Sequence, residues 1–137
     1  MRLKRLIPML NVSDIERSLA FYRDALGFEV VSDLKAVKEW EWALIRSGET
    51  ELMLTQSDCD LGLYKGPEPE KDGSWPALYY FYPEDVAALH AHVVERGYRP
   101  TELDVTFYGM REFGLRDPDG HALAFGQDAG ESAPKDA

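Results

Sequence analysis

Residues 12–28 read Val12-Ser13-Asp14-Ile15-Glu16-Arg17-Ser18-Leu19-Ala20-Phe21-Tyr22-Arg23-Asp24-Ala25-Leu26-Gly27-Phe28. Ser13 followed by Glu16 has the pattern of a capping box, which predicts that a helix begins here. The helical spacing of four apolar residues places them on one face: Ile15, Leu19, Tyr22 and Leu26. Gly27 predicts the end of this helix, because glycine readily adopts the left-handed conformation that follows a last turn. We expect strands on both sides, over residues 6–12 and 28–32.

The same order of landmarks occurs a second time. After the first helix, strands are predicted over residues 39–45 and 51–56. The second set comprises a strand over 78–82, a helix that begins near Val86 and closes at Gly97, and strands over 106–107, 110–115 and 122–127. A repeat of about 70 residues that occurs only twice is too long for a solenoid. We therefore predict an α+β fold: two βαβββ modules whose curved mixed sheets form a shared cavity, across a dimer.

The predicted boundaries follow the composition. The first module covers residues 1–65, a linker rich in proline, glycine and charge covers 66–76, the second module covers 77–127, and a flexible tail covers 128–137. Each half is too small to bury both faces of its own sheet, so we expect one structural domain in all.

Composition narrows the class of protein. The 137 residues include 15 basic and 25 acidic side chains, which gives a net charge of −10 and argues against nucleic-acid binding. No apolar run approaches the ~18 residues that span a bilayer, so no membrane partner is expected. Cys59 is alone in the chain, so no internal disulfide can form, and we expect a reducing, cytoplasmic location.

Residues 12–28 together with Met110-Arg111-Glu112-Phe113-Gly114-Leu115-Arg116-Asp117-Pro118-Asp119-Gly120 resemble the vicinal-oxygen-chelate superfamily. This superfamily includes glyoxalase I, extradiol dioxygenases and the bleomycin-resistance proteins, and the resemblance covers about residues 5–127. The pattern of residues 110–120 is nearest to the bleomycin-resistance-like subgroup. Because the superfamily is functionally broad, the fold alone does not assign an activity.

The resemblance also implies where a metal would be held. Enzymes of the superfamily usually bind a divalent ion with a residue in the first strand and one in the last strand of each module. Counting from Asp14, Asp85 and Gly120 places these positions at Ile7, Met53, Leu78 (or Ala77) and Ala124. None of these side chains offers the oxygen or imidazole donors that such metals require. A shift of register brings in only Glu49 or Glu51, a single ligand, so we predict neither a metal nor another cofactor.

The other reactive side chains form no recognisable site. His90 and His92 lie two apart on a predicted helix and point in different directions, so they do not share a metal. His121 follows a turn glycine and is expected to be exposed. We expect solvated or capping roles for all three histidines, and Cys59 has no base near it in sequence.

Aromatic residues occur where the ligands are missing. Trp40 and Trp42 alternate along one predicted strand, and Tyr80 and Tyr82 share the phase of Leu78 along another. Phe107 and Tyr108 follow, and the acidic residues Glu39, Glu41, Asp104 and Glu112 form a predicted rim. Strands favour aromatic residues in any case, so each one alone is also consistent with ordinary packing. Together they predict a lined cavity suited to a planar or cationic guest.

The leading functional prediction is a metal-free, homodimeric binding protein similar to the bleomycin-resistance proteins. We expect it to confer antibiotic resistance by sequestering a planar or cationic small molecule, such as a bleomycin-like one, in an aromatic groove. The alternative is a lyase, isomerase or transferase of the same superfamily that acts on a small organic substrate, with Glu112 as its candidate catalytic base. A regulatory partner protein is a third reading. The predicted ligand-binding residues are Trp40, Trp42, Met53, Tyr80, Tyr82, Phe107, Tyr108 and Glu112.

Overall fold

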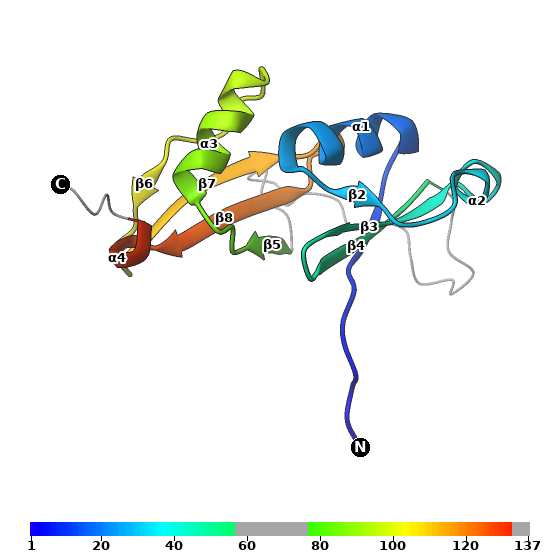
Figure 1. Ribbon diagram of the computed structural model, residues 1–137, viewed down its shortest axis with the longest axis horizontal. Helices are drawn as coiled ribbons and strands as arrows, with labels where there is room; N and C mark the ends of the chain where they lie inside the picture. The colour runs from blue at the N-terminus through cyan, green and yellow to red at the C-terminus, as the bar shows by residue number, and fades with distance from the viewer. Residues whose placement is uncertain (57–76, 133–137) are drawn as a thin grey trace. The chain divides into compact units, whose positions relative to one another are not determined.

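The computed structural model describes residues 1–56 and 77–132, and the chain divides into two compact units, Met1–Pro67 and Glu68–Ala137 (Figure 1). The first unit contains β1 (Met9–Asn11), α1 (Ile15–Leu26), β2 (Glu29–Val30), α2 (Leu34–Trp40), β3 (Trp42–Ser47) and β4 (Thr50–Thr55). The second unit contains β5 (Leu78–Phe81), α3 (Val86–Glu95), β6 (Asp104–Val105), β7 (Met110–Arg116), β8 (Ala122–Asp128) and α4 (Ala129–Ser132).

Each unit is built on one four-stranded sheet. The strand order is β1-β4-β3-β2 in the first unit and β5-β8-β7-β6 in the second. In both sheets the first strand pairs in parallel with the last, and the remaining pairs are antiparallel. The predicted α+β fold with two mixed sheets is therefore confirmed, and β1, which follows Pro8, is an edge strand as the proline indicates.

A glutamine at the end of the last strand performs the same task in both units. The side-chain oxygen of Gln56 accepts a hydrogen bond from the backbone N–H of Ile15 at 2.8 Å, and that of Gln127 accepts one from the N–H of Val86 at 3.0 Å. Ile15 and Val86 are the first residues of α1 and α3, where backbone N–H groups have no partner within the helix. The two modules thus match residue for residue at this point.

The core of the first unit lies between α1 and its sheet. Tyr22 of α1 is fully buried, and its ring meets the rings of Phe21 and Phe28 edge to face, at 5.1 and 5.7 Å between centroids. Alternate residues of β3 and β4, among them Ile45, Leu52 and Leu54, are buried. This period of two leaves the intervening side chains on the other face of the sheet.

The core of the second unit is aromatic. Phe125 of β8 stacks with Phe113 of β7 at 4.9 Å and with Phe81 of β5 at 5.1 Å, and Val86 and Val93 of α3 are fully buried. The alternate side chains of these strands therefore form the opposite face, which we call the open face. It carries Leu78, Tyr80, Glu112, Gly114, Arg116, Ala122, Ala124 and Gly126.

Two predicted elements of the first unit are wrong in detail. The N-cap of α1 is Asp14 rather than Ser13: its carboxylate accepts from the N–H of Arg17 at 3.2 Å. The predicted strand over 39–45 begins only at Trp42, because Asp33 caps a helix that continues to Trp40. Glu41, with a φ of 51°, then turns the chain into β3. The alternation of Trp40 and Trp42 resembled a strand, but the two residues belong to different elements.

The second unit also departs from prediction at two places. The strand expected over 106–107 lies at Asp104–Val105, because Thr106 and Gly109 instead close a turn, with the N–H of Gly109 donating to the carbonyl of Thr106 at 3.0 Å. The predicted tail begins too early, since β8 includes Asp128 and α4 follows. The N–H of Ala129 donates to the carbonyl of Gly109 at 2.9 Å, an anchor made by backbone rather than by apolar side chains.

Some predictions concern residues outside the described ranges. These are the linker over 66–76, Cys59 and the part of the tail beyond residue 132. Within residues 1–56 and 77–132, the structure contains no helix of the length and apolar character needed to cross a membrane.

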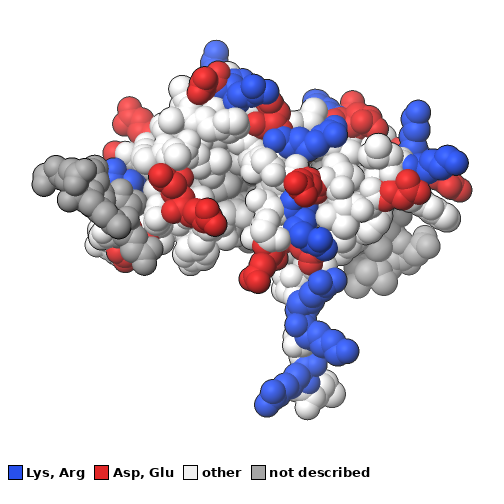
Figure 2. All heavy atoms as spheres, viewed as in Figure 1, with Lys and Arg blue, Asp and Glu red and all other residues white. Residues whose placement is uncertain are grey.

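An N-terminal arm precedes β1. In residues 1–6, Leu3 and Leu6 are 95% and 83% exposed. The arm also carries Arg2, Lys4 and Arg5, and Figure 2 shows basic atoms along the segment that ends at the N-terminus in Figure 1. Near the end of the arm, Arg5 pairs with Glu51 of β4 at 3.0 Å.

Candidate ligand-binding site

Two predicted site residues of the second unit converge on the carboxylate of a third, Glu112. The phenol of Tyr80 donates to one oxygen of Glu112 at 2.7 Å, and the phenol of Tyr108 donates to the other at 2.6 Å. Tyr80 lies on β5, Glu112 lies on β7, and Tyr108 belongs to the turn that precedes β7. A carboxylate has about four lone-pair sites. Two donors therefore orient Glu112 and leave it able to accept from a ligand.

Gly126 makes this arrangement possible. β8 lies between β5 and β7, and Gly126 is the cross-strand partner of Glu112. A Cβ built on Gly126 would overlap the phenol oxygen of Tyr80 and crowd its ring. Glycine thus lets the Tyr80 ring lie flat across the middle strand and reach the carboxylate on the far side.

The two phenols remain protonated well into the alkaline range. Burial raises the pKa of Tyr80 above its ordinary value, and the hydrogen bond to Glu112 raises it further. For Tyr108, the hydrogen bond to Glu112 is the first cause of the raised pKa, followed by burial. Both groups therefore act as donors at neutral pH, and the negative charge of the cluster resides on Glu112.

Exposed aromatic rings flank this cluster. Tyr82 lies 5.1 Å from Tyr80 between ring centroids and is 77% exposed. Phe107 meets Tyr108 edge to face at 5.0 Å and is fully exposed. Such rings present their faces to solvent beside an anionic group, an arrangement suited to cation–π contact and stacking.

The other three predicted binding residues belong to the first unit. Trp40 ends α2 and is 66% exposed, whereas Trp42 begins β3, is half-buried and pairs with Thr55. Met53 of β4 lies in register with Met9 of β1. Their part in ligand binding stays a prediction.

The positions that the resemblance implies for metal ligands carry apolar side chains in both units. Met53 donates its N–H to the carbonyl of Pro8, and Leu78 and Ala124 line a hollow described below. Glu51, the candidate after a shift of register, accepts from Arg46 at 2.8 Å and pairs with Arg5, and the bond from Arg46 is the main cause that lowers its pKa. Among the described residues, no three His, Cys, Asp or Glu side chains lie close enough to hold a metal.

Two of the histidines differ from their predicted solvated or capping roles. His121 is only 6% exposed rather than solvated, and its backbone N–H donates to the Asp117 carboxylate at 2.8 Å. His90 contacts the carbonyl of Thr101 through Nε2 at 2.9 Å and packs against Phe113. These contacts give the His90 side chain a structural role.

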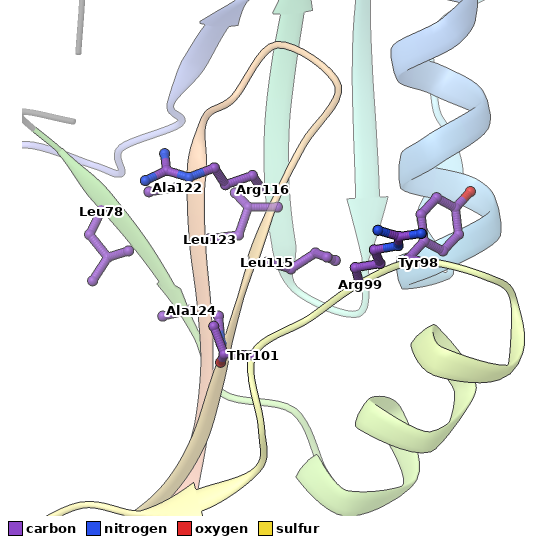
Figure 3. A pocket seen from close by; sticks show the side chains of 10 residues that line it. Leu78, Tyr98, Arg99, Thr101, Leu115, Arg116, Ala122, Leu123 and Ala124 are labelled. Atoms are coloured by element: carbon purple, nitrogen blue, oxygen red, sulfur yellow. The ribbon is translucent and has the colours of Figure 1, made fainter. Parts of the chain in front are cut away.

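Sequence reasoning missed a hollow of about 530 Å³ in the second unit (Figure 3). Its lining comes from β5, β7, β8 and the segment after α3, and it includes Arg99, Thr101, Gly114 and Arg116. Arg116 has the same strand phase as Glu112, which was a usable signal. Arg99 and Thr101 lie outside any regular element, so no periodicity pointed to them.

The fold agrees with comparisons to known proteins. Residues 4–125 match the model of the Glyoxalase/Bleomycin resistance protein/Dioxygenase superfamily. The chain belongs to this superfamily. A comparison with curated proteins found no match.

Solved structures of the superfamily share the fold. TnmS3, an antibiotic binding protein from Streptomyces sp. CB03234, is 23% identical, with 93% of this chain and 98% of that one covered and a TM-score of 0.69. A bleomycin-binding protein complexed with bleomycin is 22% identical (91% and 98% covered, TM-score 0.66). Lactoylglutathione lyase from Agrobacterium tumefaciens is 18% identical (92% and 95% covered, TM-score 0.65). At these identities the likeness shows the fold alone, and the superfamily contains both binders and enzymes.

Proposed function

We propose that this protein is a metal-free binder that sequesters a planar or cationic small molecule on the open face of its second unit. The observation that carries the proposal is the Glu112 carboxylate, oriented by the phenols of Tyr80 and Tyr108. A cationic group on the ligand pairs with this carboxylate, and its planar part stacks on Tyr82 or Phe107. Two solved relatives, an antibiotic binding protein and a bleomycin-binding protein, support this class of ligand.

The direct test is a thermal-shift titration with bleomycin and a panel of planar cations. A ligand at about 100 times its Kd adds about 2.7 kcal/mol to stability, which is an easily measured shift. Glu112→Gln keeps the shape and the acceptor oxygen but removes the charge, so we expect binding about 10-fold weaker or worse. Glu102→Gln, at an exposed carboxylate, is the matched control and should bind as the unaltered protein does.

The same experiment separates the binder from an enzyme. Glu112 is also the candidate general base, since a fixed carboxylate can accept a proton from a bound substrate. The binding hypothesis fails if planar cations leave the melting temperature unchanged while a small organic substrate is turned over. If Glu112→Gln also abolishes that turnover, the protein is an enzyme with Glu112 as its base.

The proposed working unit is a homodimer, and the proposed setting is the cytoplasm. Leu3 and Leu6 of the arm and the exposed Leu78, Phe107 and Tyr82 place large apolar side chains at the surface. Apolar surface of this kind commonly marks an interface or a ligand groove. A second copy of the chain is the partner that covers the arm in this proposal.

A further inference from the structure

The two phenols that bond to Glu112 are held to different degrees. Tyr80 is half-buried on β5, and its ring lies against Gly126 of β8, where a Cβ would overlap the phenol oxygen. Tyr108 is 55% exposed in the turn between β6 and β7, and its ring contacts Phe107, which is itself fully exposed. Burial is the first cause that raises the pKa of Tyr80, whereas the hydrogen bond to Glu112 is the first cause for Tyr108. Tyr80 is therefore held by the sheet, and Tyr108 mainly by the carboxylate itself.

The backbone of this turn is fixed, so the Tyr108 side chain is the part that can move away. The N–H of Thr106 donates to the carbonyl of Met110 at 2.7 Å, and the N–H of Gly109 donates to the carbonyl of Thr106 at 3.0 Å. Exposed side chains change rotamer within nanoseconds. Tyr108 can thus leave Glu112 by rotation about its side-chain bonds, without a change in the fold.

A cationic group is a stronger partner for Glu112 than a phenol is. The bond from Tyr108 to Oε1 of Glu112 is 2.6 Å long, but its donor is neutral and exposed, so water competes for both groups. Asp104, the cross-strand neighbour of Glu112 on β6, adds negative charge on the same face. A planar amidinium or guanidinium brings a positive charge and donates two parallel N–H bonds, one to each carboxylate oxygen. Such a group therefore needs Oε1, and there it meets the donor that leaves more easily.

We propose that Tyr108 is an exchangeable donor: its phenol occupies Oε1 of Glu112 in the ligand-free protein and turns to solvent when a planar amidinium-type cation binds, while Tyr80 remains bonded to Oε2. This inference rests on the proposed function, and it names the class of cation and the residue that such a ligand replaces. Tyr80 is then a positioning residue that keeps the carboxylate in place. Tyr108 is a competitor that the ligand displaces.

Two substitutions that each remove one hydroxyl test this proposal, with benzamidine as the cation. Tyr108→Phe removes the competitor, so we expect benzamidine to bind about 3- to 10-fold more tightly in a calorimetric titration. Tyr80→Phe removes the donor that stays, so binding should become weaker by a similar factor. Tyr79→Phe, on the other face of β5, removes a phenol outside the site and should leave the affinity unchanged. The sign is decisive, because loss of a donor that only orients Glu112 would weaken binding at either position.

NMR of protein labelled at the tyrosine ring carbon Cζ follows the exchange directly, and each resonance is identified from its Phe variant. Benzamidine should move the Tyr108 resonance towards that of a solvated phenol and move the Tyr80 resonance much less. The proposal is overturned if benzamidine binds none of these forms, if Tyr108→Phe binds it no more tightly than the unaltered protein, or if the Tyr108 resonance stays in place at saturation.

The proposed function is judged separately in the same titrations. It fails if Glu112→Gln binds benzamidine and the other planar cations as tightly as the unaltered protein does. It stands, without the exchange at Tyr108, if another planar cation binds through Glu112 and benzamidine does not.

Discussion

Tyr80 and Glu112 lie two strands apart in the second sheet, and their side chains meet across Gly126 of the strand between them. The hydrogen bond of 2.7 Å between them therefore depends on a third residue that contributes no side chain. This dependence makes Gly126 a sharper probe of the site than either partner.

Gly126→Ala should displace the Tyr80 ring and break its bond to Glu112. Overpacking of this kind costs about 1–3 kcal/mol, and the loss should appear as a lower midpoint of chemical denaturation. Gly114→Ala is the matched control, since its nearest contact would be 3.6 Å away and its effect should lie within about 1 kcal/mol of neutral. Equal effects of the two changes would show that the Tyr80 ring does not lie across β8.

Tyr80 should also make stability depend on pH in the alkaline range. Its pKa in the folded protein is raised above the ordinary value of 10.0, chiefly by burial. A raised pKa contributes stability that is fully present below pH 10 and is lost as the pH rises toward the folded value. Stability of Tyr80→Phe should therefore fall less steeply above pH 10 than that of the unaltered protein. Denaturation midpoints across this range measure the difference, and parallel curves would contradict the raised pKa.

The purified protein should contain no stoichiometric divalent metal. Leu78 and Ala124 offer no donor atoms, and Glu51 is already neutralised by Arg46 and Arg5. Elemental analysis before and after chelation checks this expectation. About one equivalent of zinc, iron, manganese or nickel per chain, removed together with ligand binding, would show that a metal site forms from other residues.

The chain should sediment as a homodimer at tens of micromolar, rather than as a monomer of 15.5 kDa. Replacing the two exposed leucines of the arm, Leu3→Glu with Leu6→Glu, should weaken the dimer without lowering the melting temperature of the fold. Leu34→Glu, at a leucine 68% exposed in α2, is the control. If Leu34→Glu dissociates the dimer and the arm variant does not, the dimer interface does not include the arm.

The glutamine caps should stabilise their units to a similar degree. Gln127→Leu removes the acceptor for the N–H of Val86, and Gln56→Leu does the same for Ile15. Loss of a cap costs about 1 kcal/mol. Denaturation of each variant measures the loss, and an unchanged midpoint would mean that water replaces the side-chain oxygen at no cost.

The two-module fold was predictable because the helix-end signals within each module agree with the repeat of the same landmarks between the modules. Gly27 ends α1 in the left-handed conformation, and the glutamines at 56 and 127 occupy equivalent places in the two repeats. Prediction failed at Trp40, because the alternating aromatic pair indicates a strand, whereas Asp33 caps a helix that continues to Trp40. The shared phase of Tyr80 and Leu78 follows from strand period, whereas the partnership of Tyr80 with Glu112 depends on strand order, which periodicity does not encode. Arg99 of the hollow lies outside any regular element, so periodicity did not point to it, whereas the strand phase that Arg116 shares with Glu112 was an available signal.

Gly126 also has a consequence for tracing this protein's relatives. A tyrosine can lie across the middle strand only where that strand carries glycine, so we expect Tyr80, Glu112 and Gly126 to change together among relatives. Within a superfamily of binders and enzymes, chains that keep all three residues share this arrangement of the carboxylate. Chains that replace the glycine must orient the tyrosine differently, whatever else they retain. Conclusions about the open face therefore apply to members of the superfamily with glycine at the position of Gly126. They do not apply to members with another residue there.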